Sequence, residues 1–259
     1  MILDWFRSVV MAFSMFSVLP TPRIAWKKEN MRYMLCALPL VGVLIGAAAL
    51  GWFYLAQALE LGTVLYAAGL TLLPLGLSGG IHLDGFCDTA DARASCAEPA
   101  RRREILKDSH TGAFALIHLC VYLLAYLALC TELSRSAHSA LLLGLSHVLA
   151  RVLGGAASAL LPSAGEGLQS TFRSAASRRS GLTFALWLLA CLAAALALRP
   201  AAVPAAAIAC AACFFRLRHI ARREFGGMSG DLAGYLITSS ALWLLAGLVI
   251  TEKVVLLCF

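Results

Sequence analysis

Residues 37–59 read ALPLVGVLIGAAALGWFYLAQAL, an apolar run that contains no charged side chain. A helix of about 20 apolar residues spans the roughly 30 Å hydrocarbon layer of a bilayer and satisfies its own backbone hydrogen bonds there. The run therefore predicts a transmembrane helix. Composition extends this conclusion to the whole chain, because 61% of its 259 residues are hydrophobic and only 14% are charged.

Further apolar runs of spanning length follow the first one. A shorter run, 201–215, comes after Arg199-Pro200 and contains Pro204, so we interpret 181–215 as a hairpin of two spans. Seven spans result, and six remain the alternative. We expect an all-α, polytopic membrane helical bundle that forms a single integral-membrane domain over residues 1–259. The other runs are 62–80, 112–130, 137–161, 181–198 and 232–250.

Basic residues lie almost entirely on one side of the predicted spans. Of the 21 Lys and Arg residues, 17 fall in the segments 1–36, 81–111, 162–180 and 216–231. Cytoplasmic loops are enriched in these residues, so we expect the N-terminus and the loops 81–111 and 216–231 in the cytoplasm, and the C-terminus outside. Arg151 lies within a span, where a charge indicates a functional role; we expect it to line the bundle interior and to bind substrate.

The N-terminal run Trp5–Leu19 is apolar but short, contains Arg7 and ends at Pro20-Thr21-Pro22. No small-residue cleavage site follows it, so it predicts an interfacial or re-entrant helix that stays attached to the chain. The net charge of +7 then suits the anionic headgroups of membrane lipid. Nucleic acid is not expected as a partner.

The densest charged segment is 79–112, where Asp84, Asp88 and Asp91 follow one another at spacings of four and three. In a helix these carboxylates share one face within about 60°. Crowded carboxylates repel one another unless a hard cation binds them, and Mg²⁺ is held by a few carboxylates together with phosphate oxygens of a substrate. The spacing therefore indicates metal ligands or catalytic acids, with solvated loop carboxylates as the alternative.

A second polar group, Lys107, Asp108, Ser109 and Gly112, stands directly before the third span. A cation, a carboxylate and a hydroxyl beside a glycine at a helix start suit contact with phosphate, because the free backbone N–H groups there attract anions. We therefore expect these residues to bind substrate. A solvated basic helix face that ends in a cap is the alternative.

A third polar group lies between the last two predicted spans, where Gly226, Gly227, Ser229 and Asp231 occur in the sequence GGMSGD. Glycine backbone can approach a phosphate closely, and Asp231 opens the last predicted helix. This segment is a further candidate for substrate binding. A flexible turn with Asp231 as its N-cap is the alternative.

Together these blocks resemble the cobalamin synthase family, also called adenosylcobinamide-GDP ribazoletransferase. Residues 79–91, GGIHLDGFCDTAD, match its signature G-G-x-H-x-D-G-x-x-D-T-x-D. Residues 105–112, ILKDSHTG, are similar to its second block, Ile/Met-Leu/Met-Lys/Arg-Asp-Ser-x-x-Gly, and 226–231 to its late block, Gly-Gly-x-Thr/Ser-Gly-Asp. Residues 13–22 and 38–42 are similar to the family's opening, so the resemblance covers nearly the whole chain.

The resemblance implies a late step of vitamin B12 synthesis. Adenosylcobinamide-GDP and α-ribazole, or its phosphate, would give adenosylcobalamin, or its phosphate, with release of GMP. Mg²⁺ would be bound by Asp84, Asp88 and Asp91 and would neutralise the diphosphate. His82 or one of the aspartates would accept the proton of the attacking hydroxyl.

The remaining motif residues acquire roles from the same resemblance. Lys107, Ser109 and the segment 226–231 would hold phosphates or the guanosine, and Asp108 and Asp231 would be metal-linked or orienting. Two positions depart from the family pattern: Ala92 stands where relatives commonly have glycine, and His110 where many have arginine. The second departure removes a permanent cation from the phosphate site, whereas the carboxylates are unaffected.

Two other classes of protein are weighed against this one. A CDP-alcohol phosphotransferase needs Ala-Arg three residues after its first Asp-Gly, where this chain has Cys87-Asp88-Thr89. A transporter would carry its acidic residues at the bilayer midplane of two related halves, and we find no convincing internal repeat. The resemblance implies the bacterial cytoplasmic membrane. It leaves open whether the acceptor is phosphorylated and whether the protein forms a homo-oligomer or associates with other enzymes of the corrin pathway.

Overall fold

The computed structural model of the chain describes residues 2–108, 110–165, 167–176 and 180–258. Throughout these ranges every regular element is a helix, and a single isolated bridge pairs Ser163 with Met228, which confirms the all-α prediction. In chain order the helices are α1 (Ile2–Phe16), α2 (Lys28–Met31), α3 (Met34–Ala58), α4 (Thr63–Ser78), α5 (Ile81–Ala94), α6 (Pro99–Ile105), α7 (Ala113–Glu132), α8 (Ala137–Leu160), α9 (Leu168–Ala175), α10 (Ser180–Leu198), α11 (Ala202–Glu224) and α12 (Gly230–Cys258).

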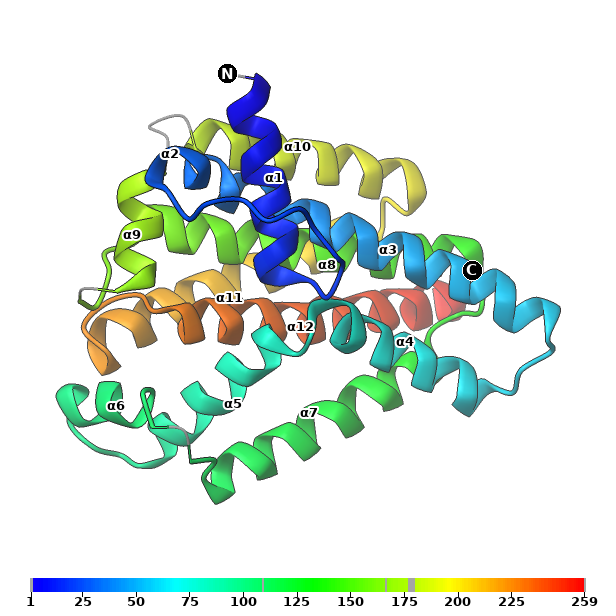
Figure 1. Cartoon of the computed structure of the whole chain (residues 1–259). Coiled ribbons are helices and arrows are strands. Elements are labelled where there is room, and N and C mark those ends of the chain that lie inside the picture. Colours follow the sequence, from blue (N-terminus) through cyan, green and yellow to red (C-terminus); the bar gives the residue numbers. More distant parts are fainter. Residues whose placement is uncertain (1, 109, 166, 177–179, 259) are drawn as a thin grey trace.

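Six helices of the described chain, α3, α7, α8, α10, α11 and α12, are long and apolar enough to cross a membrane. A seventh span results if α4 and α5 are counted together, although the pair is bent by 94°. The multi-pass prediction is confirmed, and the hairpin expected at 181–215 is present as α10 and α11. The less secure span is not 201–215 but 62–80, because α4 is too short to cross a membrane by itself and counts only together with α5. Figure 1 shows α3, α8 and α12 running alongside one another through the bundle, with α7 inclined to them.

The α3–α8 pair forms the most extensive helix–helix contact among the described residues. A Cβ atom at Gly46 of α3 would lie 2.9 Å from the Cα atom of Gly144, and one at Gly42 would lie 2.7 Å from the carbonyl oxygen of His147. Small residues allow this approach, and membrane helices depend on it because lipid provides no hydrophobic drive between them. The buried α8 therefore serves as the frame on which the other helices are arranged.

The bend between α4 and α5 is produced by Gly79 and Gly80. Their φ angles of 63° and 75° lie in the left-handed region, which residues with a Cβ atom rarely adopt. The backbone N–H of Val18 donates to the carbonyl oxygen of Leu77 at 3.0 Å and supports this corner from the N-terminal segment. The segment 81–111 thus differs from the loop expected there, since α5 and α6 occupy much of it.

The outer surface of the bundle is apolar. Leu124 of α7 and Leu189 of α10 are 66% and 60% exposed, as are many neighbouring side chains, which suits contact with lipid rather than with water. Helix α1 crosses the bundle in front of α3 (Figure 1) and buries Met11 while leaving Trp5 exposed. An amphipathic helix in this orientation is consistent with the interfacial helix expected from the sequence.

Candidate active site

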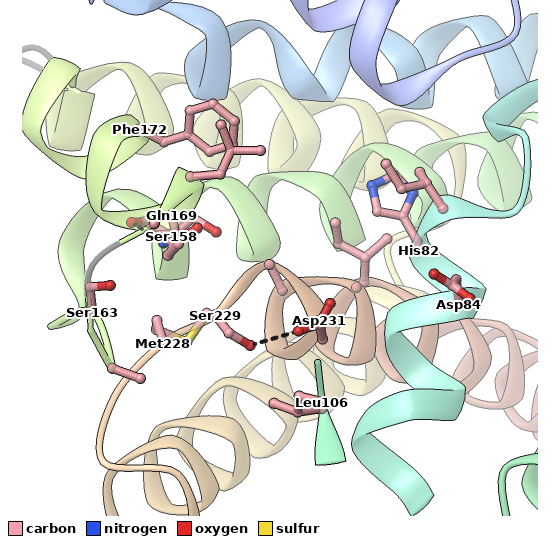
Figure 2. A pocket seen from close by; sticks show the side chains of 18 of the residues that line it. His82, Asp84, Leu106, Ser158, Ser163, Gln169, Phe172, Met228, Ser229 and Asp231 are labelled. Carbon is pink, nitrogen blue, oxygen red and sulfur yellow. Dashed lines mark hydrogen bonds between the residues drawn. The ribbon is translucent and has the colours of Figure 1, made fainter. Parts of the chain in front are cut away.

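A cavity of about 560 Å³ opens where α5, α12, α9 and the end of α1 meet. His82 and Asp84 of α5 line one end of it, with Asp231 of α12 nearby (Figure 2). Arg103 and Lys107, from α6 and the turn after it, also line this cavity. Two blocks of sequence more than 140 residues apart are therefore brought to one site with both signs of charge.

The imidazole of His82 is held in the first turn of α5. Its ring stacks on that of Phe16, with centroids 5.7 Å apart, and its backbone carbonyl accepts a hydrogen bond from Thr238 Oγ1 at 3.0 Å. The side chain is buried, and neither ring nitrogen has a hydrogen-bond partner among the described atoms. A buried polar group without a partner is costly, so a ligand group that reached these nitrogens would satisfy them.

Asp231 points into the cavity because another residue caps its helix. The backbone N–H of Leu232 donates to Ser229 Oγ at 3.2 Å, so Ser229 provides the N-terminal cap of α12. Ser229 also donates to Asp231 Oδ2 at 3.4 Å, a bond drawn in Figure 2. The alternative in which Asp231 is only the N-cap is therefore wrong, and both residues belong to the cavity lining.

Asp88 and Asp91 lie further along α5 and do not line the cavity. The negative charge of Asp88 is nevertheless repelled by the negative charges of Asp84, Asp231 and Asp91, so the four carboxylates form one acidic cluster. Asp91 accepts a hydrogen bond from the backbone N–H of Ala115 at 3.3 Å, at the start of α7. The cluster thus joins α5 to two neighbouring helices.

Gly112 is explained by this cluster. A Cβ atom at position 112 would lie 2.2 Å from both carboxylate oxygens of Asp91, which no real side chain could do. With a side chain at residue 112, the Asp91 carboxylate would have to move from its place beside the start of α7. The glycine predicted to bind substrate is thus placed in direct contact with a predicted metal ligand.

The cations of the site are fixed by an ion-pair network between α5, α6 and α11. Glu224 of α11 accepts from Arg93 Nε at 2.8 Å and from Arg102 Nη1 at 2.6 Å. Arg103 donates through Nη1 to the carbonyl oxygen of Phe225 at 2.9 Å. These partly buried, charge-assisted bonds hold α6 beside the cavity, so that Arg103 and Lys107 face it.

The segment 226–231 has a backbone that requires its glycines. Gly226 has a φ of 73° and Gly227 a φ of 154°, and a Cβ atom at Gly227 would lie 2.5 Å from the backbone N of Ala164. The loop is paired with 162–164, because Met228 N–H donates to Pro162 O at 2.7 Å and Ala164 N–H to Met228 O at 3.0 Å. The two glycines therefore shape the loop that carries Ser229 and Asp231 to the cavity.

Known proteins resemble this chain in sequence over nearly its whole length. The sequence profile of the cobalamin-5-phosphate synthase family matches residues 8–249. This chain belongs to the cobalamin-5-phosphate synthase family. A protein of Lachnoclostridium phytofermentans, named adenosylcobinamide-GDP ribazoletransferase, is 37% identical over 98% of this chain and 97% of its own length. No solved structure matches the chain.

Two further relatives carry the same name. The protein of Geobacillus kaustophilus is 33% identical over 90% of this chain and 92% of its own length, and that of Geobacillus thermodenitrificans is 35% identical over 88% and 89%. The resemblance read from the motifs is thus confirmed. Neither the phosphotransferase of CDP-alcohols nor the transporter is favoured by these relatives.

Some residues singled out in this cobalamin-5-phosphate synthase family member lie away from the cavity. Asp108 is exposed and pairs with His110, whose backbone N–H and imidazole lower the pKa of the Asp108 carboxyl. Arg151 is buried in α8, where its Nη1 donates to the carbonyl oxygen of its neighbour His147 at 3.1 Å. It does not line the cavity. Ser109 lies outside the described residues.

Other lining residues of this family member were not singled out from its sequence. Ser158 of α8, and Gln169 and Phe172 of α9, lie at the end of the cavity away from His82 (Figure 2). Gln169 Nε2 donates to the carbonyl oxygen of Ser158 at 2.9 Å, and Phe172 is buried. Helix α9 is short and carries no distinctive motif. The only sign in the sequence that it contributes to a site is the polar Gln169 next to the apolar Leu168.

The acidic cluster suits a hard cation in the type of its donor atoms, which are all carboxylate oxygens. Among the described residues no three His, Cys, Asp or Glu side chains converge closely enough to enclose a metal ion by themselves. Mg²⁺ needs only one or two carboxylates when a substrate phosphate completes its coordination. The residues of the cluster therefore fit a cation that binds together with a phosphorylated substrate.

Proposed function

We propose that this membrane protein joins adenosylcobinamide-GDP to α-ribazole or α-ribazole phosphate. A ribose hydroxyl oxygen forms a bond to the phosphorus that carries the cobinamide, and the anhydride bond to the second phosphate breaks. The products are adenosylcobalamin, or its phosphate, and GMP. The observation that carries this proposal is that His82, Asp84 and Asp231 share a cavity with two cations in a member of this family.

The phosphate chain is assigned to the cationic side of the cavity. Arg103 and Lys107 line it and are both available as N–H donors toward an anion, although Arg103 also donates to Phe225 O. Charge-assisted hydrogen bonds of this kind fix the position of a diphosphate and stabilise the negative charge that builds up on the leaving GMP. Alignment and charge neutralisation are the main requirements of such a transfer.

The proton of the attacking hydroxyl is assigned to His82. This side chain lines the cavity, and neither of its nitrogens is engaged by described atoms. Stacking on Phe16 holds the ring in place. Both nitrogens are buried, so substrate binding has to shift the cavity lining for the hydroxyl to reach one of them. Asp84, which lines the same end, is the second group able to accept it.

Asp84 and Asp231, with Asp88 and Asp91 behind them, would hold Mg²⁺, which when bound supplies positive charge against the diphosphate. Their mutual repulsion supports this assignment, because without a cation a set of neighbouring carboxylates is unfavourable. Asp231 comes from α12 and the others from α5, so a cation there would also tie these two helices together.

The end of the cavity away from His82 is assigned to a nucleoside base. There Gln169 offers an amide, Phe172 an aromatic ring and Ser158 a hydroxyl. A guanine presents both N–H donors and a carbonyl acceptor, which suit an amide held in a fixed orientation. We therefore assign the guanosine of adenosylcobinamide-GDP to this end.

The protein is further proposed to lie in the bacterial cytoplasmic membrane, with the cavity facing the cytoplasm. The cavity opens near α6, α9 and the loop before α12, on the side that carries most Lys and Arg residues. That distribution supports a cytoplasmic location for this end of the bundle.

The test is GMP release by the purified protein in liposomes, supplied with adenosylcobinamide-GDP, α-ribazole phosphate and Mg²⁺. We expect GMP and a cobalamin product in equal amounts, and their loss when EDTA is added and recovery with excess Mg²⁺. Turnover that survives EDTA treatment would contradict the metal assignment alone. Absence of product in a folded sample that has CDP-alcohol phosphotransferase activity would contradict the reaction itself.

A further inference from the structure

An open hollow of about 510 Å³ lies between α1 and the segment that leads into α2, apart from the active-site cavity. Arg7 of α1 faces Arg23 and Lys27 across it, and Glu29 is its one acidic lining residue. Three cations and one carboxylate thus line the hollow, so its lining carries an excess of positive charge.

The hollow is held in shape by buried hydrogen bonds. Ser8, next to Arg7, is fully buried, and its Oγ donates to the carbonyl oxygen of Asn30 at 2.7 Å and accepts from Tyr33 N–H at 3.2 Å. Asn30 Nδ2 in turn donates to the carbonyl oxygen of Ala25 at 2.9 Å. These bonds fix the backbone of α1 to that of the 23–30 segment, so the three cationic residues are held on the same hollow.

The hollow lies where the first span begins. Asn30 precedes Met34, the first residue of α3, by four positions, so the lining segment lies at the level at which this span enters the bilayer. Trp5 and Trp26 flank the hollow in sequence and are 53% and 54% exposed. Exposed indoles are typical of the membrane interface, where lipid phosphates also lie.

We propose that this hollow binds the phosphate of one anionic phospholipid headgroup. Arg7 and Arg23 donate to its oxygens, Lys27 adds charge, and Trp5 and Trp26 contact the glycerol region. A free phosphate ion shares the same chemistry, but it has no need of exposed indoles or of a position at the start of a span. The site does not depend on the transferase reaction, so its test measures lipid retention and not turnover.

The experiment compares purified protein carrying Arg7→Gln, Arg23→Gln and Lys27→Gln with the unaltered protein, by native mass spectrometry from detergent. We expect the unaltered protein to retain phosphatidylglycerol in preference to phosphatidylcholine. The triple variant should lose that preference by about tenfold or more. A second variant, Arg7→Lys with Arg23→Lys and Lys27→Arg, keeps the charges and should keep the preference, provided that both variants retain the melting temperature of the unaltered protein.

The matched control removes three exposed cations from the same basic side, Arg173→Gln, Arg222→Gln and Arg223→Gln, none of which lines the hollow. It should retain phosphatidylglycerol as the unaltered protein does. Equal loss in this control would overturn the site in favour of a general charge effect. Displacement of the lipid by equimolar inorganic phosphate or glycerol phosphate would overturn the lipid as the occupant, whereas resistance to both supports it.

Discussion

A Cβ atom at Gly85 of α5 would lie 2.8 Å from both the Cα and the carbonyl oxygen of Asp231 in α12. The two helices therefore touch backbone to backbone beside the point at which Asp84 and Asp231 enter the cavity. The substitution Gly85→Ala must push them apart, and we expect kcat for GMP release to fall by about 100-fold, because misplacement of catalytic groups by about 1 Å has such effects.

The control for this prediction is Gly76→Ala in α4, where an added Cβ atom would meet nothing within 4 Å. This variant makes the same chemical change and should keep its turnover. Both proteins are compared by GMP release in liposomes and by their elution as folded protein in detergent. Full activity of Gly85→Ala would show that the close approach of α5 to α12 is not required for catalysis.

The carboxylates at the cavity give a second prediction. Asp84→Asn and Asp231→Asn should each lower kcat by at least about 100-fold while leaving the protein inserted and folded, because each removes a charge from the cluster that faces the substrate. Asp88→Asn should lower kcat in the same way, since the charge of Asp88 interacts with those of Asp84 and Asp231. The Mg²⁺ concentration that gives half-maximal turnover should rise in any variant with residual activity.

Glu104→Gln is the matched control for the carboxylate variants. Glu104 is exposed on α6 and, among the described residues, forms an ion pair only with Arg101 three residues earlier, at 2.7 Å. Loss of this surface pair should change turnover by less than about twofold. If an aspartate variant were as active as this control, that aspartate would have no role in the active site.

Much of the fold and the site could be predicted from local patterns. Apolar runs of spanning length located the helices, and the hydrophobic signal was strong enough to separate α10 from α11 at Pro200. Spacings of four and three along 84–91 placed the carboxylates on one helix, which the structure bears out in α5. The corner at Gly79 was also foreseeable, since paired glycines before a charged helix break its continuation.

What could not be predicted depends on contacts between distant segments. The pairing of 162–164 with Met228 and the approach of Gly112 to Asp91 are set by the packing of whole helices, and no local periodicity encodes them. Arg151 illustrates the same limit. A charge within a span suggested substrate contact, but the side chain binds the carbonyl oxygen of His147 in its own helix and lies near Tyr122 and Tyr126.

The cation at the end of the second motif gives a third prediction. Lys107 lines the cavity, so Lys107→Gln should raise KM for adenosylcobinamide-GDP by about tenfold, with little change in KM for α-ribazole phosphate. Arg101→Gln removes a nearby exposed cation that does not line the cavity, and it should leave both constants unchanged. Similar increases for both substrates, or in both variants, would contradict a specific contact with the diphosphate.

The last prediction concerns stability at the opposite end of the bundle. Glu252 lies 21 positions after Asp231 in α12, roughly 30 Å along that helix, and is only 1% exposed. It accepts from Ser139 Oγ at 2.7 Å and from Ser134 N–H at 2.9 Å, with Arg199 Nη2 at 3.8 Å. One carboxylate therefore joins the turns of two helical hairpins, α7–α8 and α10–α11, to the last helix.

Glu252→Ala should leave these donors without an acceptor and reduce the free energy of unfolding by about 2–4 kcal/mol. That corresponds to a decrease in Tm of roughly 5–10 °C in detergent, measured by intrinsic fluorescence. Glu132→Ala is the control, because Glu132 pairs with Lys253 at 2.7 Å at the same end but on the exposed surface, and its loss should shift Tm by about 1 °C or less. Turnover at 25 °C should be unaffected in both variants, since the cavity is remote. Equal decreases in Tm for the two variants would mean that the buried contacts of Glu252 stabilise the fold no more than the surface pair does. Loss of turnover without a decrease in Tm would assign Glu252 a role in the reaction.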